Sequence, residues 1–205
     1  MKTLECRGIT LSDKQTKICV PITGTDLEEI KEQAEKIANM NPDVVEWRAD
    51  FYDVKDNDET EFEQCLKAIN DNLKKIPIIY TYRTSNEGGE KSIDVDDYCR
   101  LCKYVSEISE KYNVAMIDVE LYENKDRKDI GKLLLDIKST GVKVIGSNHH
   151  FEGTPSEKDI FNVLKTMEEA GADICKIAVM PKEKVDVKTL INASKKANKE
   201  LNAPI

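Results

Sequence analysis

Two histidines stand side by side in the segment KVIGSNHHFEGTP, residues 143–155, and the chain has no others. Neighbouring side chains of an extended strand point to opposite faces, so one pocket takes His149 or His150 but not both, if the strand continues that far. A histidine side chain changes charge near neutral pH and can therefore act as a general acid or base. The first question is which of the two has a partner for such chemistry.

A lysine interrupts the apolar run ICKIAVM, residues 174–180. Lys176 in a buried strand must pair with a carboxylate, such as Glu46 or Glu120, or lose its charge, because burial disfavours the charged form. An uncharged lysine amine attacks ketones and aldehydes and forms a Schiff base. If the two strands are neighbours, Lys176 and His149 can meet over one substrate, where His149 would remove a proton that the iminium makes acidic.

Other charged residues follow apolar runs in the same way. In EWRAD, strand alternation puts Glu46, Arg48 and Asp50 on one face, where a structural ion pair explains them as well as a binding site does. Arg83 ends the run IPIIYTYR. Glu87 precedes two glycines in RTSNEGGEK, where its carboxylate could orient an imidazole or simply belong to a turn.

Six apolar runs rich in valine and isoleucine recur along the chain, and each precedes a segment of helical periodicity. Thr25 followed by Glu28 predicts a capping box at the first helix, and Gly141 and Gly171 stand where helices should end. Strict alternation of strand and helix predicts a parallel sheet with helices outside. The predicted strands are 17–22, 43–49, 76–83, 114–121, 142–148 and 174–180.

Two architectures fit this alternation, an open doubly wound sheet and a closed (β/α)8 barrel. The turn after the first predicted strand, ITGTDLEE, lacks a glycine-rich phosphate loop. Charged residues inside several strands favour the barrel, because side chains there enter the interior. We therefore expect one α/β domain over residues 1–205, a (β/α)8 TIM-type barrel with about six βα units, and a hairpin from residues 4–18 that plugs its bottom.

The composition excludes several classes of protein. A net charge of -8 argues against nucleic acid or an anionic membrane as the main partner. The N-terminus has no signal-peptide pattern and no apolar run reaches 18 residues, so we expect a cytoplasmic protein. Cys99 and Cys102 form a CxxC, but Cys102 falls at the spacing of a helical core. We therefore expect free thiols and no metal site.

Six stretches in order resemble type I 3-dehydroquinate dehydratase, a lyase family of the shikimate pathway that uses a Schiff base. The resemblance covers nearly the entire chain. It implies a (β/α)8 barrel that needs no metal or organic cofactor, commonly a homodimer. The stretches are CVPITG (19–24), VVEWRADFY (44–52), YTYRTSNEGGE (80–90), IDVEL (117–121), SNHHFEGTP (147–155) and KIAVMP (176–181).

The resemblance assigns a role to each candidate. Lys176 would form the imine with the ketone of 3-dehydroquinate. His149, oriented by Glu87, would remove the proton from the adjacent carbon and then protonate the departing hydroxyl, giving 3-dehydroshikimate. Three further residues would position the hydroxyls and charge of the substrate: Glu46, Arg48 and Arg83.

The chain departs from the family in two places. His150 stands where the family commonly has aspartate, and strand alternation predicts that it points away from the substrate. The chain stops at LNAPI, which looks like the start of a seventh strand, while such barrels run to about 250 residues. An arginine, a serine and a glutamine that hold the substrate carboxylate in the family would then be absent, and open sheet edges would invite self-association. A class I aldolase-type barrel and a non-catalytic truncated fragment stay open as alternatives.

Overall fold

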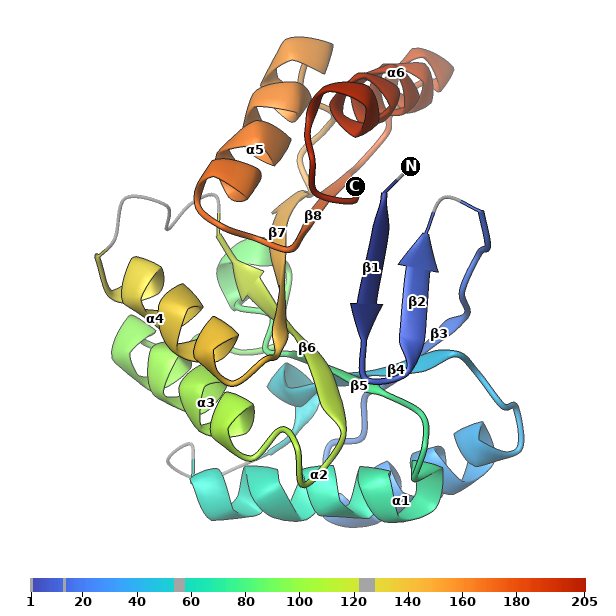
Figure 1. The fold of residues 1–205 in the computed structure, drawn as a ribbon, viewed down its shortest axis with the longest axis vertical. Helices are drawn as coiled ribbons and strands as arrows, with labels where there is room; N and C mark the ends of the chain where they lie inside the picture. The colour runs from blue at the N-terminus through green and yellow to red at the C-terminus, as the bar shows by residue number, and fades with distance from the viewer. Residues whose placement is uncertain (1, 13, 54–57, 122–127) are drawn as a thin grey trace.

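The computed structural model describes residues 2–12, 14–53, 58–121 and 128–205. Its centre is a six-stranded parallel sheet in which neighbours in the chain are neighbours in the sheet, from β3 to β8, and a separate antiparallel hairpin joins β1 and β2 (Figure 1). The strands are β1 (Thr3–Cys6), β2 (Ile9–Ser12), β3 (Cys19–Ile22), β4 (Val44–Arg48), β5 (Ile78–Thr81), β6 (Val114–Glu120), β7 (Lys143–His150) and β8 (Ile174–Val179).

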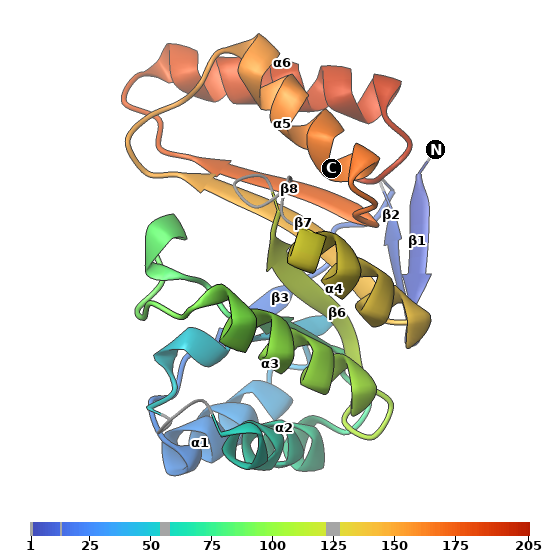
Figure 2. The same ribbon diagram turned by 90° about the vertical axis from the view of Figure 1, so that its left-hand side faces the viewer.

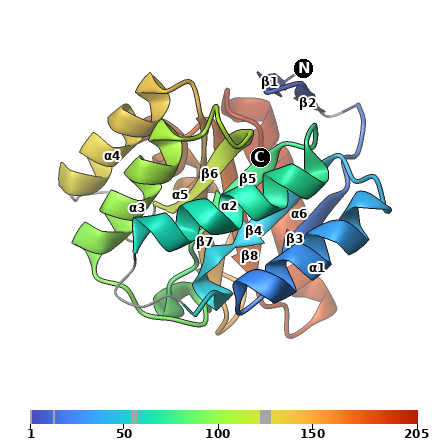
Figure 3. The ribbon, with the colours of Figure 1, turned by 90° about the horizontal axis from the view of Figure 1, so that it is seen from below.

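Each parallel strand is followed by a helix, as the sequence predicts. Figure 2 shows α5 and α6 lying over β7 and β8, and Figure 3 shows α1 and α2 side by side below the sheet. The sheet curls into an open half-barrel with the helices on its convex face, which confirms an incomplete TIM-type barrel. The helices are α1 (Leu27–Ala38), α2 (Glu59–Leu73), α3 (Val95–Glu107), α4 (Lys128–Ser139), α5 (Glu157–Glu169) and α6 (Lys184–Glu200), with 3-10 turns η1 (Ala49–Phe51) and η2 (Ser85–Glu87).

The main core lies between the convex face of the sheet and the helices. Trp47 of β4 is fully buried there, with its ring centroid 5.7 Å from that of Phe62 on α2 and 5.6 Å from that of Tyr80 on β5. Burial of such large aromatic side chains supplies much of the hydrophobic stabilisation of a sheet-helix interface. This packing fixes β4 so that the alternate residues, Glu46 and Arg48, face the concave side.

The hairpin covers the end of the half-barrel where the strands begin. Cys6 and Ile9 are buried in a second apolar cluster with Val44, Met116 and Ile145, which lie near the beginnings of β4, β6 and β7. The prediction of a hairpin that plugs the bottom is confirmed for the described residues; Asp13 lies outside them. A functional site is therefore expected at the opposite end of the half-barrel, where the strands finish.

The ends of the helices agree with the sequence in one respect and differ in another. Gly141 and Gly171 follow α4 and α5 with positive φ angles of 84° and 102°, as expected for residues that end helices. The capping box predicted at Thr25 and Glu28 is wrong by one residue. Asp26 is the N-cap and accepts from the Glu29 backbone N–H, while Glu29 accepts from Thr25. An aspartate is as good a cap as threonine, so the pattern alone did not choose between them.

None of the helices in the described parts of the chain is long and apolar enough to cross a membrane.

Candidate active site

The register of β7 and β8 decides which histidine can work with the lysine. β7 continues through His150, two residues beyond the predicted end of this strand. Lys176 pairs with Ser147 and His149 with Ala178, so Lys176 and His149 project from the same, concave face. His150 points to the other face, as predicted. Its Nε2 is buried without a hydrogen-bond partner in the described part of the chain.

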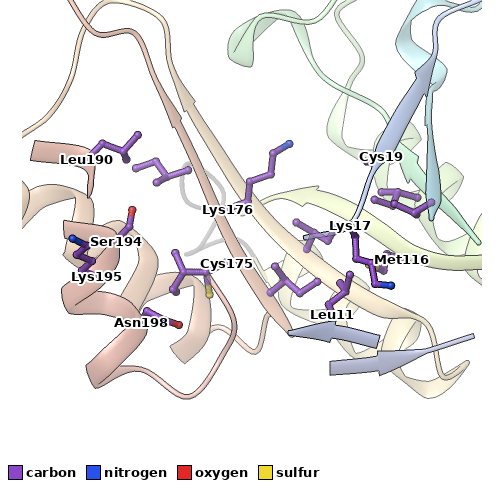
Figure 4. A pocket seen from close by; sticks show the side chains of 16 residues that line it. Leu11, Lys17, Cys19, Met116, Cys175, Lys176, Leu190, Ser194, Lys195 and Asn198 are labelled. Atoms are coloured by element: carbon purple, nitrogen blue, oxygen red, sulfur yellow. The ribbon is translucent and has the colours of Figure 1, made fainter. Parts of the chain in front are cut away.

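Lys176 lies beside a cavity that extends from the concave face past the end strand β8 to α6 (Figure 4). The cavity has a volume of about 620 Å³, and Figure 4 shows the lysine side chain extending from β8 away from α6. The lysine side chain is 43% exposed, and its Nζ lies 3.5 Å from Oδ2 of Asp118. The prediction of a buried lysine paired with Glu46 or Glu120 is therefore wrong, because Thr81 binds Glu46 and Thr84 and Arg83 bind Glu120, which leaves Asp118 as the carboxylate beside the lysine. Apolar side chains from the lower half of the strands line the cavity: Val44, Ile79, Met116, Ile145 and Ile174.

Asp118 is a site residue that the sequence did not single out. It is buried, and it accepts hydrogen bonds from the Ser147 hydroxyl at 2.5 Å and from Arg83 Nη2 at 2.8 Å. Burial by itself raises the pKa of a carboxyl group, but the charges of Arg83 and Lys176 and the Ser147 hydroxyl outweigh it, so the pKa of Asp118 is lowered. In the sequence, the only indication of Asp118 was that charged residues stand inside the predicted strand 114–121.

Arg83 is the centre of a buried charge network. Its Nη1 donates to Glu120 at 3.1 Å and to Ser147 at 2.9 Å, and the same nitrogen lies 3.5 Å from Oε2 of Glu87. Burial lowers the pKa of the Arg83 guanidinium, but the negative charges of Asp118 and Glu120 raise this pKa by more. The group therefore stays charged. Arg83 therefore holds three carboxylates in place, those of Asp118 and Glu120 on β6 and of Glu87 in the turn after β5.

His149 and Glu87 form the second half of the site. Nδ1 of His149 lies 2.9 Å from Oε2 of Glu87, whose other oxygen accepts from Asn148 at 3.1 Å. An ionised carboxylate only accepts hydrogen bonds, so Nδ1 donates to Glu87, and whenever the imidazole is neutral its Nε2 is the acceptor nitrogen. Glu87 also belongs to a 3-10 turn that Gly88 ends with a φ of 82°. Glu87 is thus both a turn residue and the partner of an imidazole, the two alternatives that the sequence left open.

Glu46 and Arg48 lie on the same concave face and are bound within it. Glu46 accepts from the Thr81 hydroxyl at 2.7 Å. Arg48 donates two hydrogen bonds to Asp50, at 2.8 and 2.7 Å, and Asp50 is completely buried. The ion-pair explanation of EWRAD is therefore correct for Arg48. The Arg48 side chain is still 23% exposed.

The structure agrees with the expectation for the cysteines. Cys102 is a free, fully buried thiol in α3, and burial raises its pKa well above the ordinary value. Among the described residues, no group of three or more His, Cys, Asp or Glu side chains could hold a metal ion.

A family model described as type I 3-dehydroquinase matches residues 18–205. The chain belongs to this family. The resemblance seen in the sequence is confirmed, and with it the prediction of an enzyme of this family, which leaves no support for the aldolase-type alternative.

Curated relatives and solved structures lead to the same family. The 3-dehydroquinate dehydratase of Clostridium novyi is 37% identical over 194 residues, which cover 95% of this chain and 74% of the relative. That of Bacillus licheniformis is 40% identical over 195 residues, covering 94% and 74%. The crystal structure of type I 3-dehydroquinate dehydratase from Clostridium difficile is 34% identical, with a TM-score of 0.92 over 100% of this chain and 79% of that one. The chain thus spans 74% to 79% of the length of these relatives.

Proposed function

We propose that this chain converts 3-dehydroquinate to 3-dehydroshikimate through a Schiff base on Lys176, with His149 as general acid and base. One observation carries the proposal. Lys176 and His149 project from the same face of two paired strands, and Glu87 holds the imidazole by its Nδ1. Family membership supports the substrate, since the relatives are named for 3-dehydroquinate.

The reaction needs three steps. The Lys176 amine adds to the substrate ketone and one water leaves, forming an iminium that makes the protons on the neighbouring carbon acidic. Nε2 of His149 takes one of these protons and returns it to the departing hydroxyl, so a second water leaves and a carbon-carbon double bond forms. Water then hydrolyses the imine, which releases the enone acid and restores the amine. One molecule of water is lost overall.

Two buried carboxylates support these steps. Asp118, 3.5 Å from the lysine nitrogen, provides a negative charge beside the iminium. Glu87 stabilises the imidazolium that forms when His149 takes the proton, as a carboxylate does for histidine in other general-base pairs.

Substrate positioning falls to the arginines and to Glu46. Arg48 is partly exposed on the concave face and can donate to the substrate without leaving Asp50. Glu46 can accept from a substrate hydroxyl. Arg83 is buried and pairs with Asp118, Glu120 and Glu87, so it would act indirectly, by holding the carboxylates that face the substrate in place.

A solved relative adds chemical support. The Clostridium difficile enzyme was determined with covalently modified comenic acid, so covalent chemistry with a small acid is known in the family.

A borohydride trap tests the proposal. The chain is incubated with 3-dehydroquinate, reduced, and digested, and the added mass is located by peptide mass spectrometry. We expect the adduct on the peptide containing Lys176 and none in Lys176→Ala. Lys195→Ala is the matched control, because Lys195 of α6 lines the same cavity and should leave the adduct unchanged. Absence of adduct from folded protein contradicts the Schiff base.

Turnover is measured separately, by the absorbance of the conjugated product. His149→Ala should keep the trapped imine and lose product formation, because the lysine step does not need the imidazole. Product without a trapped adduct would contradict the role of Lys176. An adduct without product in the wild-type chain would support the imine site and make the chain a non-catalytic member of the family.

The homodimer also stays a prediction. β3 and β8 are the end strands of the six-stranded order, and end strands carry backbone groups that can pair with another chain. Sedimentation velocity over a range of protein concentrations should give a discrete dimer. A monomer at all concentrations would contradict it.

A further inference from the structure

Phe151 follows the two histidines and lies between His149 and the turn that carries Glu87. It is 52% exposed, which is unusual for a phenylalanine. On one side its ring is stacked against the ring of His149, with centroids 6.3 Å apart and planes inclined by 16°. On the other side it rests on Gly88, the residue after Glu87.

The contact with Gly88 is so close that any other residue there would displace the ring. A Cβ atom at Gly88 would overlap Cζ and Cε2 of the Phe151 ring. The φ angle of Gly88 is 82°, in the left-handed region that glycine adopts most easily. Because of both features, the Phe151 ring packs directly on the backbone at position 88, one residue from Glu87.

The turn that carries Glu87 is itself rigidly attached to β5. The backbone N–H groups of Glu87 and Gly89 both donate to the Thr84 carbonyl, at 3.0 and 2.8 Å. A Cβ at Gly89 would overlap the Arg83 carbonyl, so the turn lies directly against the end of the strand. Movement of the turn relative to β7 is therefore limited by the contacts between the turn and residues 149–151.

We propose that Phe151 is a positioning residue whose ring holds the imidazole plane of His149 and the Glu87 turn in register, so that the bond from Nδ1 to Glu87 stays formed. This rests on the proposed function of His149. Asn148 and Arg83 already hold the Glu87 carboxylate, whereas the ring of Phe151 contacts the imidazole and the turn simultaneously and so restrains the plane of the imidazole relative to that carboxylate. A side chain that is half exposed contributes little to the core, so its effect on the site is separable from an effect on folding.

The test reads the hydrogen bond directly and needs no turnover. Proton NMR of the wild-type protein should show a slowly exchanging, downfield imidazole N–H signal. Glu87→Ala should remove this signal and His150→Asn should keep it, which assigns it to the bond between His149 and Glu87. We expect Phe151→Ala to lose the signal by fast exchange, with little change in the thermal midpoint. Phe161→Ala, which removes a partly buried ring from α5, is the matched control and should keep it.

Two further variants test whether the contact of the ring with Gly88 is the cause. Phe151→Leu retains apolar bulk against Gly88 without a planar ring, so it should recover part of the protection from exchange. Gly88→Ala displaces the ring from the other side and should lose the signal as Phe151→Ala does. If Phe151→Ala is folded and keeps the signal with wild-type exchange, the proposal is overturned.

Kinetics distinguish positioning from substrate contact. Phe151→Ala should lower kcat by about tenfold to a hundredfold, as expected for a misplaced catalytic group, with KM and the trapped imine little changed. In a Glu87→Ala background the same substitution should cost little more, because Phe151 acts through Glu87. Additive effects would contradict the proposal. If no imine can be trapped at all, the proposed function fails, while the NMR result still decides the positioning.

Discussion

Oδ2 of Asp118 on β6 lies 3.5 Å from Nζ of Lys176 on β8, across the intervening strand β7. The aspartate is buried and the lysine is not, so the negative charge is fixed while the amine is free to reach a substrate. Arg83 binds the other oxygen of the same carboxylate at 2.8 Å. A single buried charge therefore organises both the nucleophile and the network behind it.

Asp118→Asn should lower the free energy of unfolding by about 2 kcal/mol, because hydrogen bonds to a charged group are lost where no water replaces them. The pKa of Asp118 is lowered in the folded protein, so its contribution is present above the ordinary value of 3.8 and is lost as the pH falls through the folded pKa. Chemical denaturation at pH 7 measures the effect. Asp136→Asn, on the more exposed surface of α4, is the control and should change little. Equal losses from both variants would contradict the role of Asp118.

Glu87→Gln should lower kcat while the trapped imine at Lys176 remains. The amide keeps an acceptor for the imidazole and therefore the geometry, but it removes the charge that stabilises the imidazolium. In comparable general-base pairs that loss costs about a hundredfold to ten-thousandfold in rate. Steady-state kinetics measure it, with Glu90→Gln as the control in the same loop. Unchanged kcat in Glu87→Gln would rule out a catalytic use of this bond.

Asp50→Ala should be among the most destabilising single changes in the chain. The carboxylate is completely buried and accepts from the side chain of Arg48 and from the backbone N–H groups of Arg83 and Glu90. Its removal leaves a partly buried guanidinium and two backbone donors without their partner, at a cost of about 3 kcal/mol or more. Asp53→Ala, which removes an exposed ion pair with Lys91, is the matched control for thermal unfolding. A similar midpoint for the two variants would contradict this prediction.

Glu63 should make stability depend on pH in acid. Its carboxylate accepts hydrogen bonds from Lys111, Tyr104 and Tyr112, which lower its pKa to about 2. A lowered pKa stabilises the fold above the unfolded value near 4.5, and this contribution is lost as the pH falls toward 2. The thermal midpoint of Glu63→Gln should therefore lie below that of the wild type at pH 6, and the gap should narrow steadily as the pH falls from 4.5 toward 2. A gap that stays constant over this range would show that the pKa is not the cause.

The sequence by itself determined the elements and the face on which each side chain lies. Strand and helix periodicities are local, and they sufficed for six strands, the alternating helices and the incomplete barrel. Parity along a strand also separated His149 from His150, since the faces of a strand alternate wherever the strand persists. The same locality explains the misplaced helix cap, because Thr25 and Asp26 are chemically equivalent candidates one residue apart.

Only the tertiary structure decided which distant residues meet. By strand register Glu120 is level with Lys176 through Ser147, but Thr84 and Arg83 bind the Glu120 carboxylate, and Asp118, two residues earlier in β6, is the carboxylate that contacts the lysine. The curl of the sheet and the turn after β5 brought Gly88 beneath the ring of Phe151. Such contacts depend on how strands are offset and how sharply the sheet bends. These are properties of the packed core as a whole and leave no periodic signal in the neighbouring sequence.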